Sequence, residues 1–132
     1  LLARALQLFM PGKPQVWYLD LFAGKNDYAA MERAGAGGHK EINRTNLSKE
    51  AMAAALEKPV VQRQLELLKL RADCPVFQEG TAITVKAEGS ALTMAWEKGG
   101  QIAALKADLA DASFTLTVVD EATGKEVYSM KQ

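Results

Sequence analysis

The sequence predicts an α+β chain made of two unlike parts, and two observations support this prediction. Before about residue 77 the long apolar stripes have helical spacing, whereas after it apolar and polar residues alternate as they do in β-strands. A long, glycine-containing connection also interrupts the first part. We therefore place residues 1–75 in one domain and residues 76–132 in a small antiparallel β domain.

A short helix opens the chain. Leu2, Leu6 and Phe9 lie at i, i+4 and i+7, so they share one face of a helix that another element must cover. A proline–glycine pair then ends this helix. Because no capping residue precedes Leu1, the pattern indicates a chain cut out of a larger one.

A strand buried on both sides is predicted at residues 15–19. The run QVWYLDLF is short, β-branched and aromatic, and its apolar residues fall on both faces, as in a parallel sheet. We expect Trp17 and Tyr18 to be core residues. The following connection, residues 23–46, is long for a compact domain, and such loops are more often functional than idle. Its tract AGAGGHK is expected to be flexible.

Two helices follow this connection, over residues 48–73. Ser48 precedes an alanine-rich segment of high helix propensity, and Pro59 permits a second helix to begin. Pro75 ends that second helix. The apolar stripe of the second helix consists of Val61, Leu65, Leu68 and Ala72, and it is widened by Leu67 and Leu70.

About five short strands are predicted after Phe77. Glycine-containing turns separate them, and one face of the resulting meander is apolar. The segment at residues 103–109 is the weakest of the five, because its alanines would equally suit a helical turn. Trp96 falls on the apolar face, so we expect it in the core and not as a platform for stacking sugars. The clearest alternation is shown by Ile83, Val85 and Ala87, by Leu92, Met94 and Trp96, and by Phe114, Leu116 and Val118.

Composition and charge exclude several classes of function. The 16 basic and 16 acidic side chains balance, which argues against a nucleic-acid partner, since such proteins gain affinity from a basic face. The first apolar run is short and interrupted by Arg4 and Gln7, so neither a signal peptide nor a membrane partner is predicted. The single cysteine, Cys74, excludes an internal disulfide and favours the reducing cytoplasm. We expect Cys74 to be a partly buried structural thiol.

Familiar cofactor and metal motifs are missing from the chain. The tracts AGKND and GAGG lack the spacing of a P-loop or of a dinucleotide-binding turn. His39 is the only histidine and has no cysteine with which to share a metal, so we expect it to be solvated or to brace a loop. No cofactor, no metal and no catalytic residue are predicted.

The densest group of hydrogen-bonding side chains is in the stretch GGHKEINRTNLS, residues 37–48. Arg44 has two interpretations that spacing alone leaves open. It could be a surface arginine paired with Glu41, three residues earlier. It could instead use its planar guanidinium to hold two adjacent hydroxyls, or a carboxylate that itself holds hydroxyls.

The order PGKPQVWY, then AGKND, then INR resembles the sucrose phosphorylases of the α-amylase superfamily. The likeness is close over residues 4–44, looser in the helices, and limited to pattern and position in the β-tail. It implies that residues 1–75 are the C-terminal end of a (β/α)8 barrel, with residues 15–19 as its eighth strand and residues 21–46 as a loop on the catalytic face. Residues 76–132 would be the small C-terminal β domain.

The resemblance also implies a reaction. Such enzymes transfer glucose from sucrose or a similar glucoside to phosphate with retention, giving α-glucose 1-phosphate. The implied partners are a small sugar, inorganic phosphate as co-substrate and the rest of the catalytic barrel. Arg44 and Asn43 would bind the glucosyl group. The catalytic carboxylates would belong to earlier strands, so the chain alone is expected to be inactive and, with an unpaired strand, prone to self-association.

The sequence departs from the family pattern after the INR motif. It continues as NRTNLS, where the family has Asn-Arg-His-Tyr-Tyr, so the sugar that leaves or accepts is open. Two alternatives also remain: a glycoside hydrolase of the same superfamily, and a self-standing, non-catalytic β-module.

Overall fold

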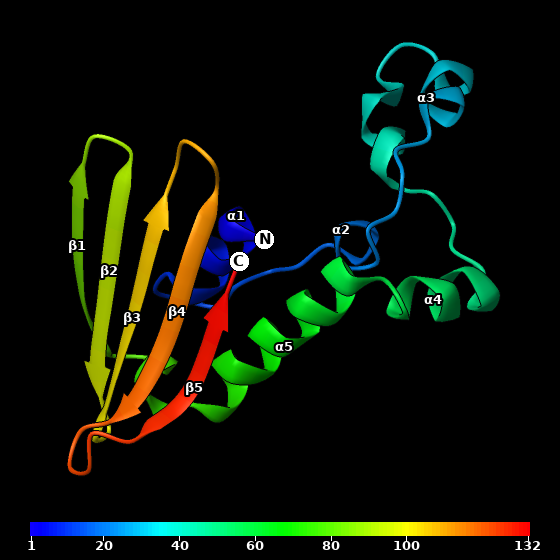
Figure 1. The fold of residues 1–132 in the computed structure, drawn as a ribbon. Helices are drawn as coiled ribbons and strands as arrows, with labels where there is room; N and C mark the ends of the chain where they lie inside the picture. Colours follow the sequence, from blue (N-terminus) through cyan, green and yellow to red (C-terminus); the bar gives the residue numbers. More distant parts are fainter. The chain divides into compact units, whose positions relative to one another are not determined.

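The computed structural model describes all of residues 1–132, which form two compact units. The sheet unit consists of Leu1–Pro14 and Leu67–Gln132, and the loop unit of Gln15–Glu66. Figure 1 labels the elements along the chain. The longest helix, α5 (Pro59–Asp73), supplies its first half to the loop unit and its second half to the sheet unit. The sequence predicts a domain boundary at residue 75, between the end of a barrel and a β domain. That boundary stays a prediction.

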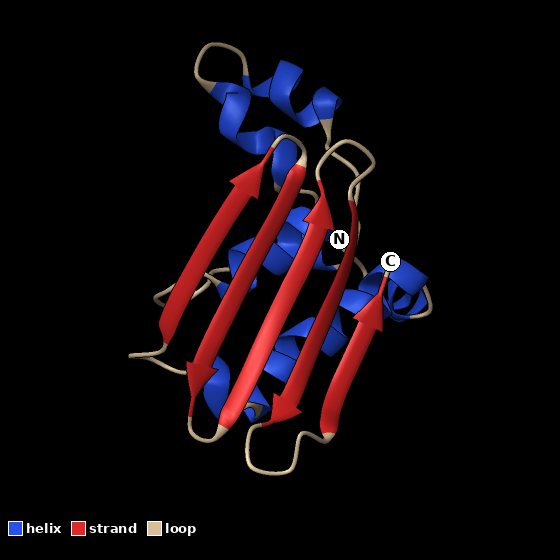
Figure 2. Ribbon diagram, turned by 60° about the vertical axis from the view of Figure 1, so that its left-hand side comes forward, coloured by secondary structure: helices blue, strands red, loops and turns tan.

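The sheet unit is built on five antiparallel strands in chain order (Figure 2). Each strand pairs with the next one along the chain, so the predicted meander is confirmed. The doubtful third strand is also confirmed, because ladders on both sides satisfy its backbone. The strands are β1 (Ala82–Glu88), β2 (Ala91–Lys98), β3 (Gln101–Asp108), β4 (Ser113–Asp120) and β5 (Glu126–Lys131).

One face of this sheet is the apolar core of the unit. Alternate residues of neighbouring strands point to the same face, and the antiparallel register brings them together. Trp96 faces the small Ala103, and Leu105 lies between Met94 and Leu116. The buried residues of β2 to β5 are Met94, Trp96, Ala103, Leu105, Ala107, Phe114, Leu116, Val118 and Met130.

An aromatic cluster joins this face to the helix α1 (Leu2–Phe9) and the short 3-10 helix η2 (Pro75–Phe77). The rings of Phe9 and Phe77 stack with centroids 4.3 Å apart, and both meet Trp96 edge-on at 6.0 and 5.6 Å. The Trp96 Nε1–H donates to the carbonyl oxygen of Phe9 at 3.1 Å, which satisfies the polar end of a buried indole. Trp96 is 1% exposed and is therefore a core residue, as predicted.

Cys74 is buried directly after the end of α5, and its predicted structural role stays a prediction that this burial supports. Burial raises the pKa of its thiol, and the adjacent Asp73 charge acts in the same direction. Because the thiolate is the reactive form, we expect the native chain to react with Ellman's reagent at pH 8 at least about tenfold more slowly than the urea-unfolded chain. Equal rates would contradict this burial.

The loop unit contains four short helical elements and the first half of α5. Ser48 caps α4 as predicted, accepting the Ala51 N–H at 3.1 Å. Gln64 of α5 is buried, and its amide donates to the carbonyls of Asp20 and Leu21 at 3.3 Å. No helix combines the length and the hydrophobicity needed to cross a bilayer. The four elements are α2 (Tyr18–Leu21), α3 (Tyr28–Ala34), the 3-10 helix η1 (Gly38–Asn43) and α4 (Lys49–Leu56).

The strand predicted at residues 15–19 is not formed. Trp17 has extended backbone angles, φ −73° and ψ 138°, but residues 13–17 have no regular structure and α2 begins at Tyr18. A parallel strand needs neighbours for its backbone hydrogen bonds, and this chain has no second strand of that kind. The predicted core position is also wrong for Trp17, whose side chain is 39% exposed.

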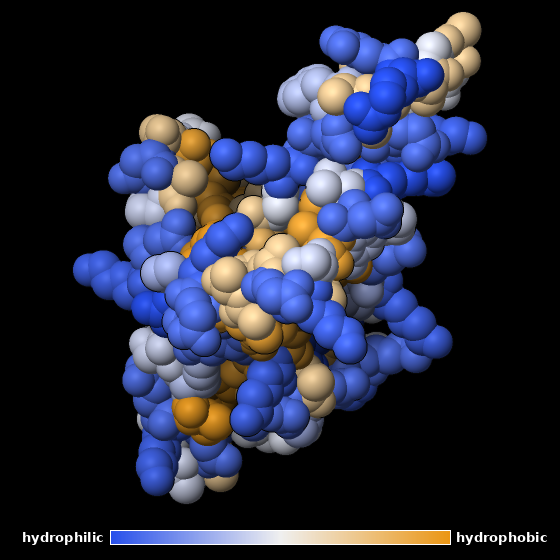
Figure 3. Space-filling model, turned by 90° about the vertical axis from the view of Figure 1, so that its right-hand side faces the viewer, coloured by the Kyte–Doolittle hydropathy of each residue, from blue (hydrophilic) through white to orange (hydrophobic).

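Apolar side chains also reach the surface, and Figure 3 shows apolar patches on one face of the molecule. Exposed apolar surface promotes association, so the predicted self-association of the chain stays a prediction that these residues motivate. The large exposed ones are Met10, Trp17, Tyr28, Leu56, Val60, Leu65, Val85, Ile102, Leu109 and Val127.

Candidate functional site

The candidate site is centred on Arg44, the residue that follows η1 in the loop unit. η1 begins after Gly37, whose φ of 85° favours glycine. At Gly38 a Cβ atom would come within 2.7 Å of the Met31 carbonyl oxygen and 2.6 Å of the Ala34 Cβ. The glycines therefore permit a left-handed turn and a close approach of η1 to α3. The last three residues of the tract AGAGGHK, residues 38–40, lie in η1, and the expected flexibility of the tract stays a prediction.

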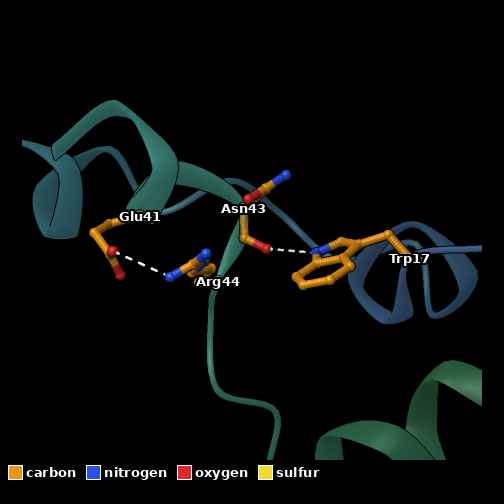
Figure 4. Close-up of polar contacts among 4 residues, drawn as sticks. All are labelled: Trp17, Glu41, Asn43 and Arg44. Carbon is orange, nitrogen blue, oxygen red and sulfur yellow. Dashed lines mark hydrogen bonds and ion pairs between the residues drawn. The ribbon is translucent and has the colours of Figure 1, made fainter. Parts of the chain in front are cut away.

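Aromatic side chains hold the backbone carbonyls of Asn43 and Thr45, the residues on either side of Arg44. Figure 4 shows the first contact, in which the Trp17 Nε1–H donates to the Asn43 carbonyl oxygen at 2.8 Å. In the second, the Tyr18 hydroxyl donates to the Thr45 carbonyl oxygen at 2.9 Å. These distances are those of well-formed hydrogen bonds.

Further hydrogen bonds tie the same segment to the preceding loop. The Thr45 hydroxyl donates to the Lys25 carbonyl oxygen at 3.0 Å, and the Asp27 N–H donates to the Ile42 carbonyl oxygen at 2.7 Å. The Asp27 carboxylate also caps α3 by accepting the Ala30 N–H at 2.8 Å. The AGKND and INR motifs are therefore brought together through their backbones.

The Arg44 side chain is much less constrained than its backbone. Its Nη1 lies 3.5 Å from Glu41 Oε1, and the two side chains are 51% and 34% exposed (Figure 4). An exposed pair of this length contributes about 0–1 kcal/mol to stability. The surface pairing that the sequence allowed is therefore present, but it leaves most of the five guanidinium donors available. Binding of a glucosyl group stays a prediction.

The other predicted residues take the following places. Asn43 is exposed and contributes its backbone carbonyl to the Trp17 contact, while a role for its side chain in sugar binding stays a prediction. His39 is exposed at the start of η1. No group of three or more His, Cys, Asp or Glu side chains is placed to hold a metal ion.

Sequence reasoning missed the anchoring role of Trp17 and Tyr18. The sequence predicts a core position for both residues because large aromatics usually pack there, yet each also carries one hydrogen-bond donor. Buried or half-buried tryptophan and tyrosine usually find a partner for that donor. Their adjacency, two donors side by side before a loop rich in backbone acceptors, is the signal that was available.

Two hollows lie in the sheet unit, and the segment that carries Arg44 lines neither of them. One, of about 240 Å³, includes Phe9, Arg71 and Trp96 in its lining. Another, of about 390 Å³, includes Lys13, Arg71 and Glu79. Arg71 lines both hollows, and its Nη2 donates a hydrogen bond to the Gly12 carbonyl oxygen at 2.7 Å. These hollows bring together no set of groups with evident chemistry.

Comparison with known proteins finds close relatives for the whole chain. The chain is 54% identical over 116 residues to a sucrose 6(F)-phosphate phosphorylase of Ilumatobacter coccineus, which covers 88% of the chain and 22% of that relative. It is 39% identical to a glucosylglycerol phosphorylase of Marinobacter adhaerens, covering 93% of the chain and 25% of the relative. No family model matches the sequence.

A solved structure shows the same fold. The crystal structure of sucrose 6F-phosphate phosphorylase from Thermoanaerobacter thermosaccharolyticum superposes with a TM-score of 0.84 and 32% sequence identity. The match covers 99% of this chain but 26% of that protein. The chain thus spans about a quarter of the length of the proteins it matches.

Proposed function

Because the chain is homologous along most of its length to the C-terminal part of sucrose and sucrose 6(F)-phosphate phosphorylases, we propose that it works as the C-terminal part of a longer glucosyl phosphorylase. The observation that carries this proposal is the 54% identity to a sucrose 6(F)-phosphate phosphorylase over 88% of the chain. Relatives named for sucrose, sucrose 6(F)-phosphate and glucosylglycerol are all phosphorylases, which supports the same reaction class here.

The proposed reaction proceeds in two steps with retention of configuration. A carboxylate attacks the anomeric carbon of the glucosyl donor while a second carboxyl group protonates the departing sugar. Inorganic phosphate, the co-substrate, then takes the glucosyl group from the covalent intermediate and yields α-glucose 1-phosphate. Both carboxyl groups would come from the barrel that precedes this chain, and no cofactor is required. A cytoplasmic location is proposed with it, since Cys74 is free.

In this proposal Arg44 holds the glucosyl group. Its guanidinium would bind a ring hydroxyl directly, or a carboxylate of the barrel that binds one, through a charge-assisted hydrogen bond. The half-exposed side chain and its weak pairing with Glu41 support this role, because little must be broken to release it. Arg44 would orient the donor and take no part in proton transfer.

We propose sucrose 6(F)-phosphate as the preferred donor. The 54% identity to the Ilumatobacter coccineus protein supports this choice, while the other relatives are 33–39% identical whichever donor they are named for. The departure NRTNLS after the INR motif also supports a leaving sugar other than unmodified fructose. A phosphate group would be held by charge-assisted hydrogen bonds, and one such bond is worth about 1.5–3 kcal/mol.

The test uses the enzyme encoded by the full reading frame that contains this chain. It is incubated with sucrose 6(F)-phosphate, sucrose or glucosylglycerol, with and without phosphate, and glucose 1-phosphate is measured by a coupled assay. We expect phosphate-dependent product, with kcat/KM at least about tenfold higher for the phosphorylated sucrose than for sucrose. Release of free glucose at the same rate without phosphate would instead indicate a hydrolase.

A further inference from the structure

Two hydrogen bonds from side chains hold the backbone around Arg44, although Arg44 itself is exposed. The carbonyls of Asn43 and Thr45, the residues on either side of Arg44, each accept a hydrogen bond from an aromatic side chain, at 2.8 and 2.9 Å. The two donors are Trp17 and Tyr18, which are adjacent in sequence and 26 and 27 residues away from their acceptors. Their rings are in contact in a tilted arrangement, with centroids 5.1 Å apart.

The contacts that Arg44 itself makes are weaker than these two hydrogen bonds. Its own contact with Glu41 is 3.5 Å long and exposed. The Arg44 N–H donates to the Glu41 carbonyl oxygen at 3.2 Å, which closes the last turn of a 3-10 helix, a conformation with poorer hydrogen-bond geometry than an α-helix. The position of the Arg44 backbone therefore depends on what holds its neighbours, and beside the two aromatic donors these contacts are the Thr45 hydroxyl bond to the Lys25 carbonyl oxygen at 3.0 Å and the Asp27 N–H bond to the Ile42 carbonyl oxygen at 2.7 Å.

We propose that Trp17 and Tyr18 are positioning residues for Arg44. The indole N–H and the phenol O–H hold the carbonyls of the flanking residues Asn43 and Thr45, so that the guanidinium starts from a defined point on the loop. This inference rests on the proposed function, in which Arg44 orients the glucosyl group. The positioning role also explains why Trp17 is 39% exposed, because its N–H must reach a loop at the surface.

The pair acts through geometry and not through contact with the sugar. Rates of oriented reactions fall steeply when a binding group moves by about 1 Å. Loss of either hydrogen bond should therefore lower kcat/KM, and we expect about a three- to tenfold decrease for each. The effect should be seen only while Arg44 is present to be positioned.

The test is a set of double-mutant cycles in the enzyme encoded by the full reading frame. Trp17→Phe and Tyr18→Phe each remove one donor and keep a ring, and both are combined with Arg44→Ala. We expect the three- to tenfold loss in the wild-type background to shrink to less than about twofold with alanine at position 44. Tyr28→Phe, at a tyrosine 61% exposed, is the matched control and should change nothing.

An independent readout does not require turnover. In Tyr18→Phe, amide hydrogen exchange over residues 38–48 should become at least about threefold faster, whereas in Tyr28→Phe it should stay as in the wild type. Tyr18→Phe removes one oxygen atom, so it keeps the test decisive if Trp17→Phe folds poorly.

Four outcomes of these experiments can be distinguished. Equal fold losses with and without Arg44, or unchanged exchange in Tyr18→Phe, would overturn the positioning role. A neutral Arg44→Ala would overturn it as well, because nothing would then need positioning. Absence of glucose 1-phosphate with the wild-type enzyme would instead refute the proposed function, and hydrogen exchange would still decide whether Tyr18 holds the segment.

Discussion

The isolated 132-residue chain is expected to produce no glucose 1-phosphate from sucrose or sucrose 6(F)-phosphate and phosphate. Retaining glucosyl transfer needs two carboxyl groups about 5–5.5 Å apart, one as nucleophile and one as acid and base. Two carboxylates of the loop unit already have partners, since Asp27 caps α3 and Glu41 pairs with Arg44 itself. Without both groups the loss should amount to the whole catalysed rate, at least about a millionfold.

The comparison enzyme for this experiment is the product of the full reading frame, measured in the same coupled assay at the same molar concentration. A host phosphorylase carried through purification would give a false signal, so the chain is purified twice by different methods and assayed after each. Turnover that keeps a constant specific activity through the second purification would contradict the proposal that the catalytic carboxylates lie outside this chain.

The β domain was predictable because its signals are local. The alternation at Leu92, Met94 and Trp96 sets which face is buried, and the glycine turns set the hairpins. The third strand was ambiguous because alanine has no strong preference for a strand. Hydrogen bonds to β2 and β4 decide its state, and those depend on residues elsewhere in the chain.

The region of residues 15–19 shows where local reasoning ends. A parallel strand exists only with its neighbours, and in this chain the apolar run forms an irregular segment and a turn of helix instead. The proposed eighth barrel strand at residues 15–19 can therefore be examined only in the presence of the barrel. The apolar pattern of residues 15–19 does not show whether the neighbouring strands are present.

The candidate site was half predictable. The density of polar groups in residues 37–48 and the INR motif directed attention to Arg44, and the geometry of its pairing with Glu41 follows from their spacing. The hydrogen bonds that hold this segment could not be predicted from the sequence. A donor at Trp17 and an acceptor at Asn43, 26 residues later, meet only through the path of the intervening loop. That path depends on the close approach at Gly38, which no single-residue preference specifies.

Replacing Arg44 with alanine in the full-length enzyme should lower kcat/KM by about thirty- to a thousandfold. If the guanidinium holds a glucosyl hydroxyl or its partner carboxylate, truncation removes a charge-assisted pair and leaves the partner without a counterion, at a cost of about 2–4 kcal/mol. At about 1.4 kcal/mol per factor of ten, this gives the stated range. Steady-state kinetics with the preferred donor, at saturating phosphate, measure the change.

Two further variants separate this role from that of a surface charge. Arg44→Lys should recover little activity, because an ammonium group cannot reproduce the planar pair of donors of a guanidinium. Lys40→Ala, at an exposed residue of η1 four positions earlier, is the matched control and should stay within about threefold of the wild type. The unfolding temperatures of all variants should agree within about 2 °C, since the Arg44–Glu41 pair at 3.5 Å contributes little to stability. Near-wild-type kcat/KM for both Arg44→Ala and Lys40→Ala would remove Arg44 from the site, because a half-exposed arginine that binds no substrate behaves like the lysine beside it.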